Sequence, residues 1–469
     1  MPTRRELLYG SVLGIAAMNV GCAKIPAARL AQSTLIDDIQ QRAFRFFWET
    51  TNPVNGLAPD RWPTKSFSSI AAVGFALTAY PIGVEHGWIS RAAARERTLT
   101  TLRFLWHAPQ GPAPTGMTGY KGFFYHFLDM ETGARLKDTE LSTIDTALLL
   151  GGALFAAGWF DGDAPGETEI RDLAQRIYAR VDWTWASPSA PLLTLGWHPE
   201  NGFIPYDWRG YNEAMLLYIL ALGAPEHALP AAAWAGWAER YPEFQGVWEG
   251  IPQLGFPPLF GHQYSHVWID FRGIRDAPMR AAGYDYFENS IRATMTQRRY
   301  SIRNPMGWEG YSADVWGLTA CDGPGDAKRA YKGSTREFRG YSARGFGGPN
   351  PFDDGTIAPT AALGSIAFTP RESIAAATAM HARYGKHIYG EYGFFDAFNP
   401  SFHYDLQVRN GRVIPGFGWV DNDYLGIDQG PIVAGIENWR SGMIWEVMRR
   451  NPQIRRGLAR AGFTQGWLG

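Results

Sequence analysis

Hydrophobic positions along the chain follow two different helical patterns. In residues 34–50 the apolar side chains recur every three or four positions, and polar residues fill the opposite side. This spacing predicts an amphipathic helix with one buried face and one wet face. Residues 68–84 are instead small and apolar on almost every side, which predicts a helix enclosed by other elements. The chain therefore begins with one helix suited to the surface and one suited to the interior.

The same alternation continues to the end of the chain. One-sided and all-round apolar segments follow in turn at 90–103, 142–159, 169–183, 211–222, 228–241, 262–272, 284–298, 370–384 and 431–440. A further inner helix falls within either 311–320 or 360–368. An outer ring of helices around an inner ring satisfies both patterns, and the segments make about six pairs. We therefore predict an all-α fold, the (α/α)6 barrel, with an irregular helical domain as the alternative.

Long aromatic segments separate the predicted helices. Residues 123–136 and 192–208 predict short β-hairpins, and the glycine-rich stretch 344–356 predicts another loop on the rim. Loops of this length are uncommon in compact domains unless they build a site. No linker or change in composition follows residue 33, so residues 34–469 are predicted to form a single catalytic domain.

The start of the chain is typical of an export signal. Arg4 and Arg5 precede an apolar run over residues 7–20, as in a twin-arginine signal. Cys22 lies where a lipobox places the lipidated cysteine, although Asn19 stands where leucine is usual. Cleavage after the following alanine, without lipidation, is the alternative.

These features predict an export signal over residues 1–22 and a short tether over 23–33. The product would be a periplasmic lipoprotein that touches the membrane only through a lipid at Cys22. No later segment is long and apolar enough to span a bilayer. We expect a monomer.

Composition narrows the class of partner. The 44 basic and 45 acidic residues leave a net charge of -1, which gives no electrostatic footprint for nucleic acid. Aromatic residues make up 14% of the chain, so flat apolar faces are available either for a large core or for stacking on sugar rings. The two cysteines, Cys22 and Cys321, make neither a disulfide framework nor a zinc pattern.

Three acidic residues lie at the predicted starts of inner helices. These are Asp145, Glu213 and Asp428. Inner helices of such a barrel run roughly parallel, so their first turns open at one mouth. Each acid has a simpler role available, because Ser142 and Asp145 make a capping pattern and any acid in a first turn is favoured by the helix dipole.

Glu213 is the strongest of the three candidates for catalysis. Apolar residues 214–217 follow it directly, so its carboxyl is expected to be partly desolvated, which raises its pKa and suits a general acid. A glycosidase needs such a group to protonate the leaving oxygen and a second, ionised carboxylate to activate water or attack the sugar.

Polar and aromatic groups on the predicted loops and helix ends are candidates for binding substrate. They are Asp60, Arg61, Glu140, Trp208, His262, Tyr264, His266, Asp270, Arg272, Trp316, Asp322 and Glu391. His262, His266 and Asp270 have a spacing that also allows a metal site. The same run is rich in sugar-type contacts, so we assign no metal and no cofactor.

Four motifs together resemble a known family. They are LSTIDTALL at 141–149, YNEA at 211–214, YSHVWIDFR at 264–272 and IDQGPI at 427–432. They are similar to the glucoamylase-like domain family, and within it to the bacterial endo-β-1,2-glucanases of glycoside hydrolase family 144. The likeness covers about residues 34–463.

The resemblance implies an (α/α)6 fold and an inverting hydrolase that cuts linear β-1,2-glucan to short sophoro-oligosaccharides without a cofactor. It places the general acid at Glu213 and the base near Asp428, with Asp421 and Asp423 close enough to compete and Asp145 as a further candidate. The family also includes enzymes that release disaccharide from a chain end and related transglycosylases. Two rivals are a non-catalytic glycan-binding lipoprotein and a polysaccharide lyase, which would need a basic cleft.

Overall fold

The computed structural model describes residues 27–469, with side chains from residue 34 onward. The predicted export signal and Cys22 lie outside the described residues. The predicted tether is helical from Ala27, where the first helix begins.

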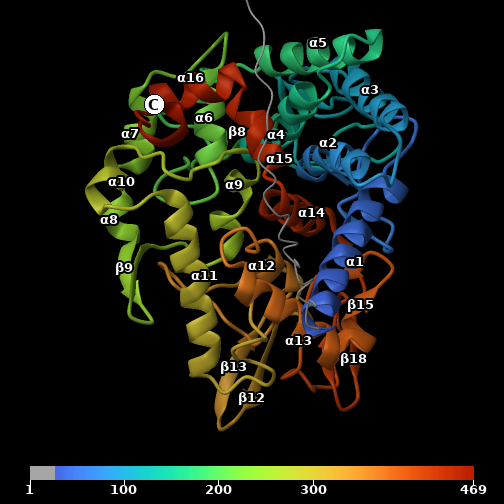
Figure 1. The fold of residues 1–469 in the computed structure, drawn as a ribbon, viewed down its shortest axis with the longest axis vertical. Coiled ribbons are helices and arrows are strands. Elements are labelled where there is room, and N and C mark those ends of the chain that lie inside the picture. The colour runs from blue at the N-terminus through green and yellow to red at the C-terminus, as the bar shows by residue number, and fades with distance from the viewer. Residues whose placement is uncertain (1–26) are drawn as a thin grey trace, which may run out of the picture.

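Two sets of helices form the body of the molecule (Figure 1). The inner set is α2 (Ile70–Glu85), α4 (Thr143–Trp159), α6 (Met215–Gly223), α9 (Tyr264–Trp268), α12 (Pro359–Leu363) and α14 (Gly426–Arg440). The outer set is α1 (Ala27–Thr50), α3 (Arg91–His107), α5 (Pro165–Ala179), α7 (Ala232–Ala238), α11 (Tyr286–Arg303) and α13 (Pro370–Ile388). The remaining helices are α8 (Tyr241–Phe244), η1 (Leu259–His262), α10 (Ala277–Ala282), α15 (Met443–Arg449), α16 (Pro452–Arg460) and η2 (Gly466–Leu468).

The inner helices pack side by side in a consistent order. α2 lies between α14 and α4, α6 follows α4, α9 follows α6, and α12 packs on α14. The Gln263 amide, just before α9, donates hydrogen bonds to the Ala361 carbonyl of α12 at 2.9 Å and to the Ser365 hydroxyl at 2.8 Å. This order is consistent with the predicted ring of six pairs.

The hydrophobic pattern explains which helices are inside. All nine residues of α6 are buried, whereas α5 buries one stripe and exposes the other. The pattern left two places for the fifth inner helix, and the structure selects the second, as α12. Residues 311–320 form no helix, because Gly317 there, like Gly310 just before, has a positive φ that interrupts helical geometry.

α2 and α4 approach each other closely at two glycines. A Cβ atom on Gly74 would lie 2.3 Å from the Leu148 carbonyl oxygen, and one on Gly152 would lie 2.0 Å from the Gly74 carbonyl oxygen. Any larger residue at either position would force the two helices apart. The starts of α2 and α4 are therefore held at a fixed spacing.

Short strands lie within the loops that connect the helices. They are β1 (Arg61–Trp62), β2 (Ser68–Ser69), β3 (Gly119–Tyr120), β4 (Phe123–Tyr125), β5 (Phe127–Leu128), β6 (Leu141–Ser142), β7 (Gly196–His198), β8 (Gly202–Phe203), β9 (Gln245–Trp248), β10 (Ile251–Leu254), β11 (Ala320–Cys321), β12 (Ala327–Tyr331), β13 (Ser334–Phe338), β14 (Ser342–Ala343), β15 (Tyr389–Gly390), β16 (Gly393–Phe394), β17 (Phe398–Asn399), β18 (Arg412–Ile414), β19 (Gly418–Val420) and β20 (Tyr424–Leu425). The hairpin predicted at 192–208 forms as β7 and β8. The hairpin predicted at 123–136 is wrong in its extent, because β4 pairs with the preceding β3, β5 pairs with β2, and only an isolated bridge joins Leu128 to Arg135. One five-stranded sheet has the order β3-β4-β6-β7-β8.

Three of these strands lead directly into inner helices. β2 precedes α2, β6 precedes α4 and β20 precedes α14. β20 also pairs with β1, with Arg61 opposite Leu425 and Trp62 opposite Tyr424. The mouth at the starts of the inner helices is thus edged by paired backbone from both ends of the chain.

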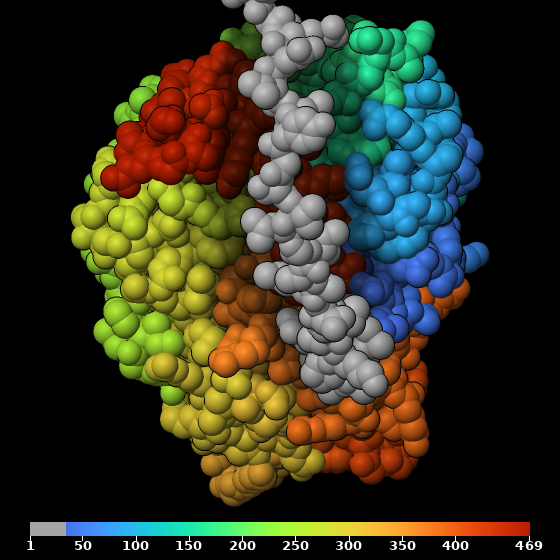
Figure 2. All heavy atoms as spheres, viewed as in Figure 1, coloured from blue at the N-terminus to red at the C-terminus, as the bar shows by residue number. Residues whose placement is uncertain are grey.

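The first helix packs against segments from much later in the chain. The blue first helix lies beside orange segments from near residue 400 (Figure 2), in line with the packing of α1 on α13, α14 and β16. Within residues 27–469, no helix combines the length and apolar character that crossing a bilayer requires.

Candidate active site

Glu213 lies immediately before α6, as predicted. The Ser265 hydroxyl donates to the Glu213 carbonyl oxygen at 2.8 Å and accepts from the Leu216 N–H at 2.9 Å, so α9 holds the start of α6. One oxygen of the Glu213 carboxyl is buried without a hydrogen-bond partner. Burial, with the nearby charge of Asp145, raises the pKa of Glu213 to about 7. The group is therefore able to carry a proton near neutral pH.

Asp145 and a histidine lie on the same side of the mouth. The Ser142 hydroxyl donates to the Asp145 carboxylate at 2.5 Å and accepts from the Asp145 N–H at 3.2 Å, so Ser142 caps α4. His126 lies between the Glu140 carboxylate, 2.8 Å from Nδ1, and the Asp145 carboxylate, 3.6 Å from Nε2. Burial alone would lower the pKa of His126, but Asp145 and Glu140 together raise it to about 9. A cation thus balances these two carboxylates.

Trp208 connects this side of the mouth to α4. Its indole N–H donates to the Thr143 hydroxyl at 3.0 Å, at the first residue of that helix. The side chain is half-buried, so its ring helps to shape the rim beside Glu213.

Four buried aspartates make up the other side of the mouth. We call Asp322, Asp396, Asp421 and Asp428 the aspartate cluster, and each exposes 3% of its surface or less. The Asp322 N–H donates to the Asp396 carboxyl at 2.7 Å. Every member of the cluster has one buried carboxyl oxygen with no hydrogen-bond partner.

Crowding and burial shift the proton affinities of the aspartate cluster. Burial raises the pKa of Asp428 to about 7, and the charges of Asp322 and Asp60 add to the rise. Burial and the neighbouring Asp428 raise the pKa of Asp396 well above its usual range. Burial and Asp396 have the same effect on the pKa of Asp421. Such a group shares protons rather than carrying a full charge on every member.

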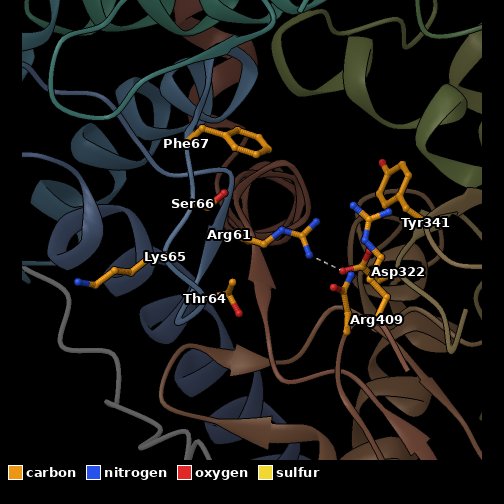
Figure 3. A pocket seen from close by; sticks show the side chains of 9 residues that line it. Arg61, Thr64, Lys65, Ser66, Phe67, Asp322, Tyr341 and Arg409 are labelled. Carbon is orange, nitrogen blue, oxygen red and sulfur yellow. Dashed lines mark hydrogen bonds and ion pairs between the residues drawn. The ribbon is translucent and has the colours of Figure 1, made fainter. Parts of the chain in front are cut away.

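Arg61 is the cation that faces the aspartate cluster. Its guanidinium reaches the Asp322 carboxylate at 2.7 Å (Figure 3). It also lies 3.2 Å from the Asp60 carboxylate and 3.7 Å from the Asp423 carboxylate. Burial still raises the pKa of Asp60 despite this contact. Arg61 and Asp322 line a cavity of about 270 Å³ together with Phe67, Tyr341 and other loop residues.

Tyr264 lies between the two sides of the mouth. It begins α9 and is buried against Phe260. Burial raises the pKa of its hydroxyl well above the usual range, and the charges of Asp428, Glu213 and Asp145 all add to that rise. The charges of all three predicted catalytic acids therefore act on one hydroxyl, consistent with their positions at the starts of α4, α6 and α14.

The two histidines predicted to bind substrate are buried beneath the mouth, which corrects their assignment. His262 is buried, donates from Nε2 to the Phe256 carbonyl oxygen at 3.2 Å and accepts at Nδ1 from the Tyr211 hydroxyl at 2.9 Å. His266 is also buried, with Nε2 3.1 Å from the Ser290 hydroxyl. Burial lowers the pKa of both to about 3. Both are core residues that neither sugar nor solvent reaches.

Four further residues assigned to substrate binding are either engaged in other contacts or fully buried. Asp270 follows the C-terminal end of α9 and forms ion pairs with Arg272 and Arg449, so this group closes the opposite end of the helix. Trp316 is completely buried and offers no ring face to a sugar. Glu391 is exposed on the β15–β16 turn, 3.5 Å from Arg45. A local mixture of polar and aromatic residues in the sequence therefore does not distinguish residues that line the mouth from residues that do not.

The structure also adds residues that the sequence did not single out for the site. Asp396 and His126 each take part in the charge network, and Tyr341 and Arg409 line the cavity near Asp322. Asp396 follows a hairpin rather than starting a helix, so the sequence marks it only as a weak polar group beside Glu391 and leaves it out of the predicted site. Oxygens of Asp322, Asp396 and Asp421 lie within 4.8 Å of one another, a spacing that a cation could bridge.

Comparisons with known proteins relate the chain to one family and to several proteins named for acting on glucans. A family model described as "Putative glucoamylase" matches residues 205–452. An exo β-1,2-glucooligosaccharide sophorohydrolase acting at the non-reducing end, from Parabacteroides distasonis, is 29% identical over 92% of this chain. The chain spans 58% of the length of that relative.

Solved structures agree over nearly the whole chain. A Bacteroides uniformis protein with the same family description is 30% identical with a TM-score of 0.79, over 93% of this chain and 99% of that one. An endo-β-1,2-glucanase from Chitinophaga pinensis, in complex with sophorotriose and glucose, is 27% identical with a TM-score of 0.78, over 93% and 99% of the two chains.

Proposed function

The chain belongs to the glucoamylase-like family, and from that premise we propose that it hydrolyses linear β-1,2-glucan to short sophoro-oligosaccharides. The catalytic domain would be an (α/α)6 barrel with the reaction at the starts of its inner helices. Endo action is the primary proposal, since the Chitinophaga endo-enzyme matches over its full length. Release of disaccharide from the non-reducing end is the second candidate, because the Parabacteroides relative is named for that activity.

One observation carries this proposal: two unlike sets of carboxyl groups face each other across one mouth. Glu213 is desolvated and holds its proton up to a pH of about 7, as a general acid must. The aspartate cluster shares protons beside Arg61, so part of it is ionised near neutral pH and can accept a proton, as a base must. Glu213 keeps its proton chiefly through burial, whereas the charge of the cluster is set jointly by burial, crowding and Arg61.

The reaction follows from these roles. Glu213 donates its proton to the glycosidic oxygen as the bond from that oxygen to the anomeric carbon breaks. A water on the opposite face of the sugar attacks the anomeric carbon, and Asp428 accepts the proton that the water loses. Because the water attacks directly, the product has the inverted, α configuration. Asp421, Asp423 and Asp145 remain candidates for the base.

Product analysis on linear glucans that differ only in linkage tests the function. We expect soluble oligosaccharides from β-1,2-glucan alone, with the α anomer seen first by NMR. Binding without products would favour the glycan-binding alternative, and unsaturated uronic products would favour a lyase. A ladder of sizes early in the reaction indicates endo action, and disaccharide alone indicates exo action.

We also propose that the protein is exported, acts as a monomer in the periplasm and is anchored by a lipid on Cys22. Replacement Cys22→Ser should move the protein from the membrane fraction to the soluble fraction and leave its specific activity unchanged. Wild-type protein found wholly in the soluble periplasm would contradict the lipid anchor but not export.

A further inference from the structure

Large exposed aromatic rings are few in the described part of the chain, and most of them lie near the mouth. Trp62, Tyr206 and Tyr341 lie on segments that lead into α2, α6 and α12, respectively. Trp439, the fourth, lies in the last turn of α14. It is eleven residues after Asp428, or about 16 Å along the helix axis from the mouth.

Trp62 is fixed in place by the strand that also carries Arg61. Successive side chains of a strand point to opposite faces. Because Arg61 points at Asp322, Trp62 faces away from the aspartate cluster, where 36% of its surface is exposed. Pairing of β1 with β20 holds both side chains to the start of α14. The backbone of Trp62 is therefore held in place, with its ring on the outer side of the rim.

A second cavity lies on this outer side. It measures about 510 Å³ and is lined by Trp62, Met130 and the loop of residues 51–54, among others. It shares Arg61, Lys65 and Ser66 with the cavity beside Asp322, so the two cavities flank one short segment of the rim. The two cavities are therefore neighbours, separated only by this segment.

The lining of the second cavity suits an uncharged sugar. Two acidic side chains, Glu49 and Glu131, are matched by two basic ones, Arg61 and Lys65. The ring of Trp62 supplies a flat apolar face of the kind that stacks on a pyranose. Its volume lies within the range of small-ligand sites.

We propose that Trp62 and the second cavity bind glucose units remote from the bond that is cut, and so give the enzyme its preference for long chains. This inference rests on the proposed function and extends it to a specificity-determining residue. Binding energy from remote units of a substrate contributes to kcat/KM only when the substrate is long enough to reach them. This site would therefore distinguish substrates by the length of the glucan chain and would take no part in the chemical step.

Kinetics on two substrates test the inference. Replacement Trp62→Ala should lower kcat/KM for long β-1,2-glucan, relative to that for the shortest cleaved oligosaccharide, by about 3- to 10-fold, the range expected for loss of one stacked ring. Trp62→Phe, which keeps a ring, should restore most of this ratio. Trp439→Ala is the matched control, since Trp439 is exposed to 37% but lies far from the mouth, and it should leave the ratio unchanged.

Each other outcome overturns the inference. An equal fall on both substrates means that Trp62 supports the fold of the rim, and an unchanged ratio means that the ring binds no sugar. Failure of the proposed function is distinguishable, because the wild-type protein would then cleave neither substrate.

Discussion

The two sides of the mouth solve the same problem, how to keep a proton on a carboxyl group, in different ways. Glu213 is nearly alone, and removal from water does most of the work. The members of the aspartate cluster are buried too, but each also faces other carboxyl groups, and Arg61 offsets only part of their repulsion. Burial acts on one group at a time, whereas crowding ties the protonation of each aspartate to that of its neighbours.

This difference teaches how the roles can be separated by mutation. Replacing Glu213 changes one proton-binding site. Replacing one aspartate changes the protonation of the others as well, because the cluster shares protons. The first substitution should therefore give a simple loss, and the second a loss accompanied by a changed pH profile.

The largest effect is expected for Glu213→Gln. The amide keeps the shape of the side chain but has no acidic proton to give, and general acid catalysis contributes about 10²–10⁴-fold. We expect kcat on natural glucan to fall by that factor while glucan binding, measured by calorimetry, survives. A substrate with an activated leaving group should recover part of the loss. Near-normal turnover would show that Glu213 only holds the helix start or the sugar.

Asp428→Asn should also lower kcat, by roughly 10²-fold or more if Asp428 activates water. An activated leaving group should give no recovery in this variant, because water attack is still impaired. The same measurement on Asp421→Asn, Asp423→Asn and Asp145→Asn identifies the base among the remaining candidates. If an activated leaving group rescues Asp428→Asn as it rescues Glu213→Gln, then Asp428 does not activate the water, and the mouth is not divided into an acid side and a base side.

The pH profile gives a smaller and graded effect. Glu213 must be protonated to act, so kcat/KM should fall about tenfold per pH unit above a pH of about 7. The pKa of Asp428, also about 7, places the acidic limb close by, so the profile should be a narrow bell near neutrality. A broad plateau from pH 5 to 9 would contradict both assignments.

Thermal stability should also depend on the protonation of Glu213. The folded protein holds the Glu213 proton up to a pH of about 7, whereas the unfolded chain releases it near pH 4.3. Stability is therefore lost as pH rises between these values, and Glu213→Gln removes that loss. We expect the variant to melt higher than wild type at pH 8 and within error of it at pH 4. An equal difference at both pH values would mean that the substitution acts through packing.

The smallest effect is expected from removal of metal. Hydrolysis should persist in excess EDTA, because acid and base are both supplied by side chains. Activity that is lost and then restored by one divalent cation would instead assign a metal to Asp322, Asp396 and Asp421, the cation-sized gap in the aspartate cluster.

The sequence predicted the first two inner helices well because a helix buried on every side is apolar at almost every position, a pattern that is visible in the sequence. Residues 68–84 and 142–159 match α2 and α4 within two residues at each end. The convergence of Asp145, Glu213 and Asp428 also followed from their place at helix starts. Sequence spacing carried no such information for loops, so Asp396 was not selected for the site and His262 was placed in it. The direction in which a loop side chain points depends on contacts made far away in the sequence.

The pairing of β1 with β20 has a consequence for how the molecule comes apart. Helical hairpins stacked in an open row can fray from either end, one repeat after another. In this protein Arg61 and Trp62, near the start of the described chain, are hydrogen-bonded to Leu425 and Tyr424, near its finish, and α1 and α2 both pack on α14. The first helices of the chain therefore cannot separate from the rest without breaking their contacts with α14 and β20. The architecture thus favours a single sharp melting transition over stepwise loss of helices, and a deletion after residue 425 would loosen the first helices of the chain as much as the last.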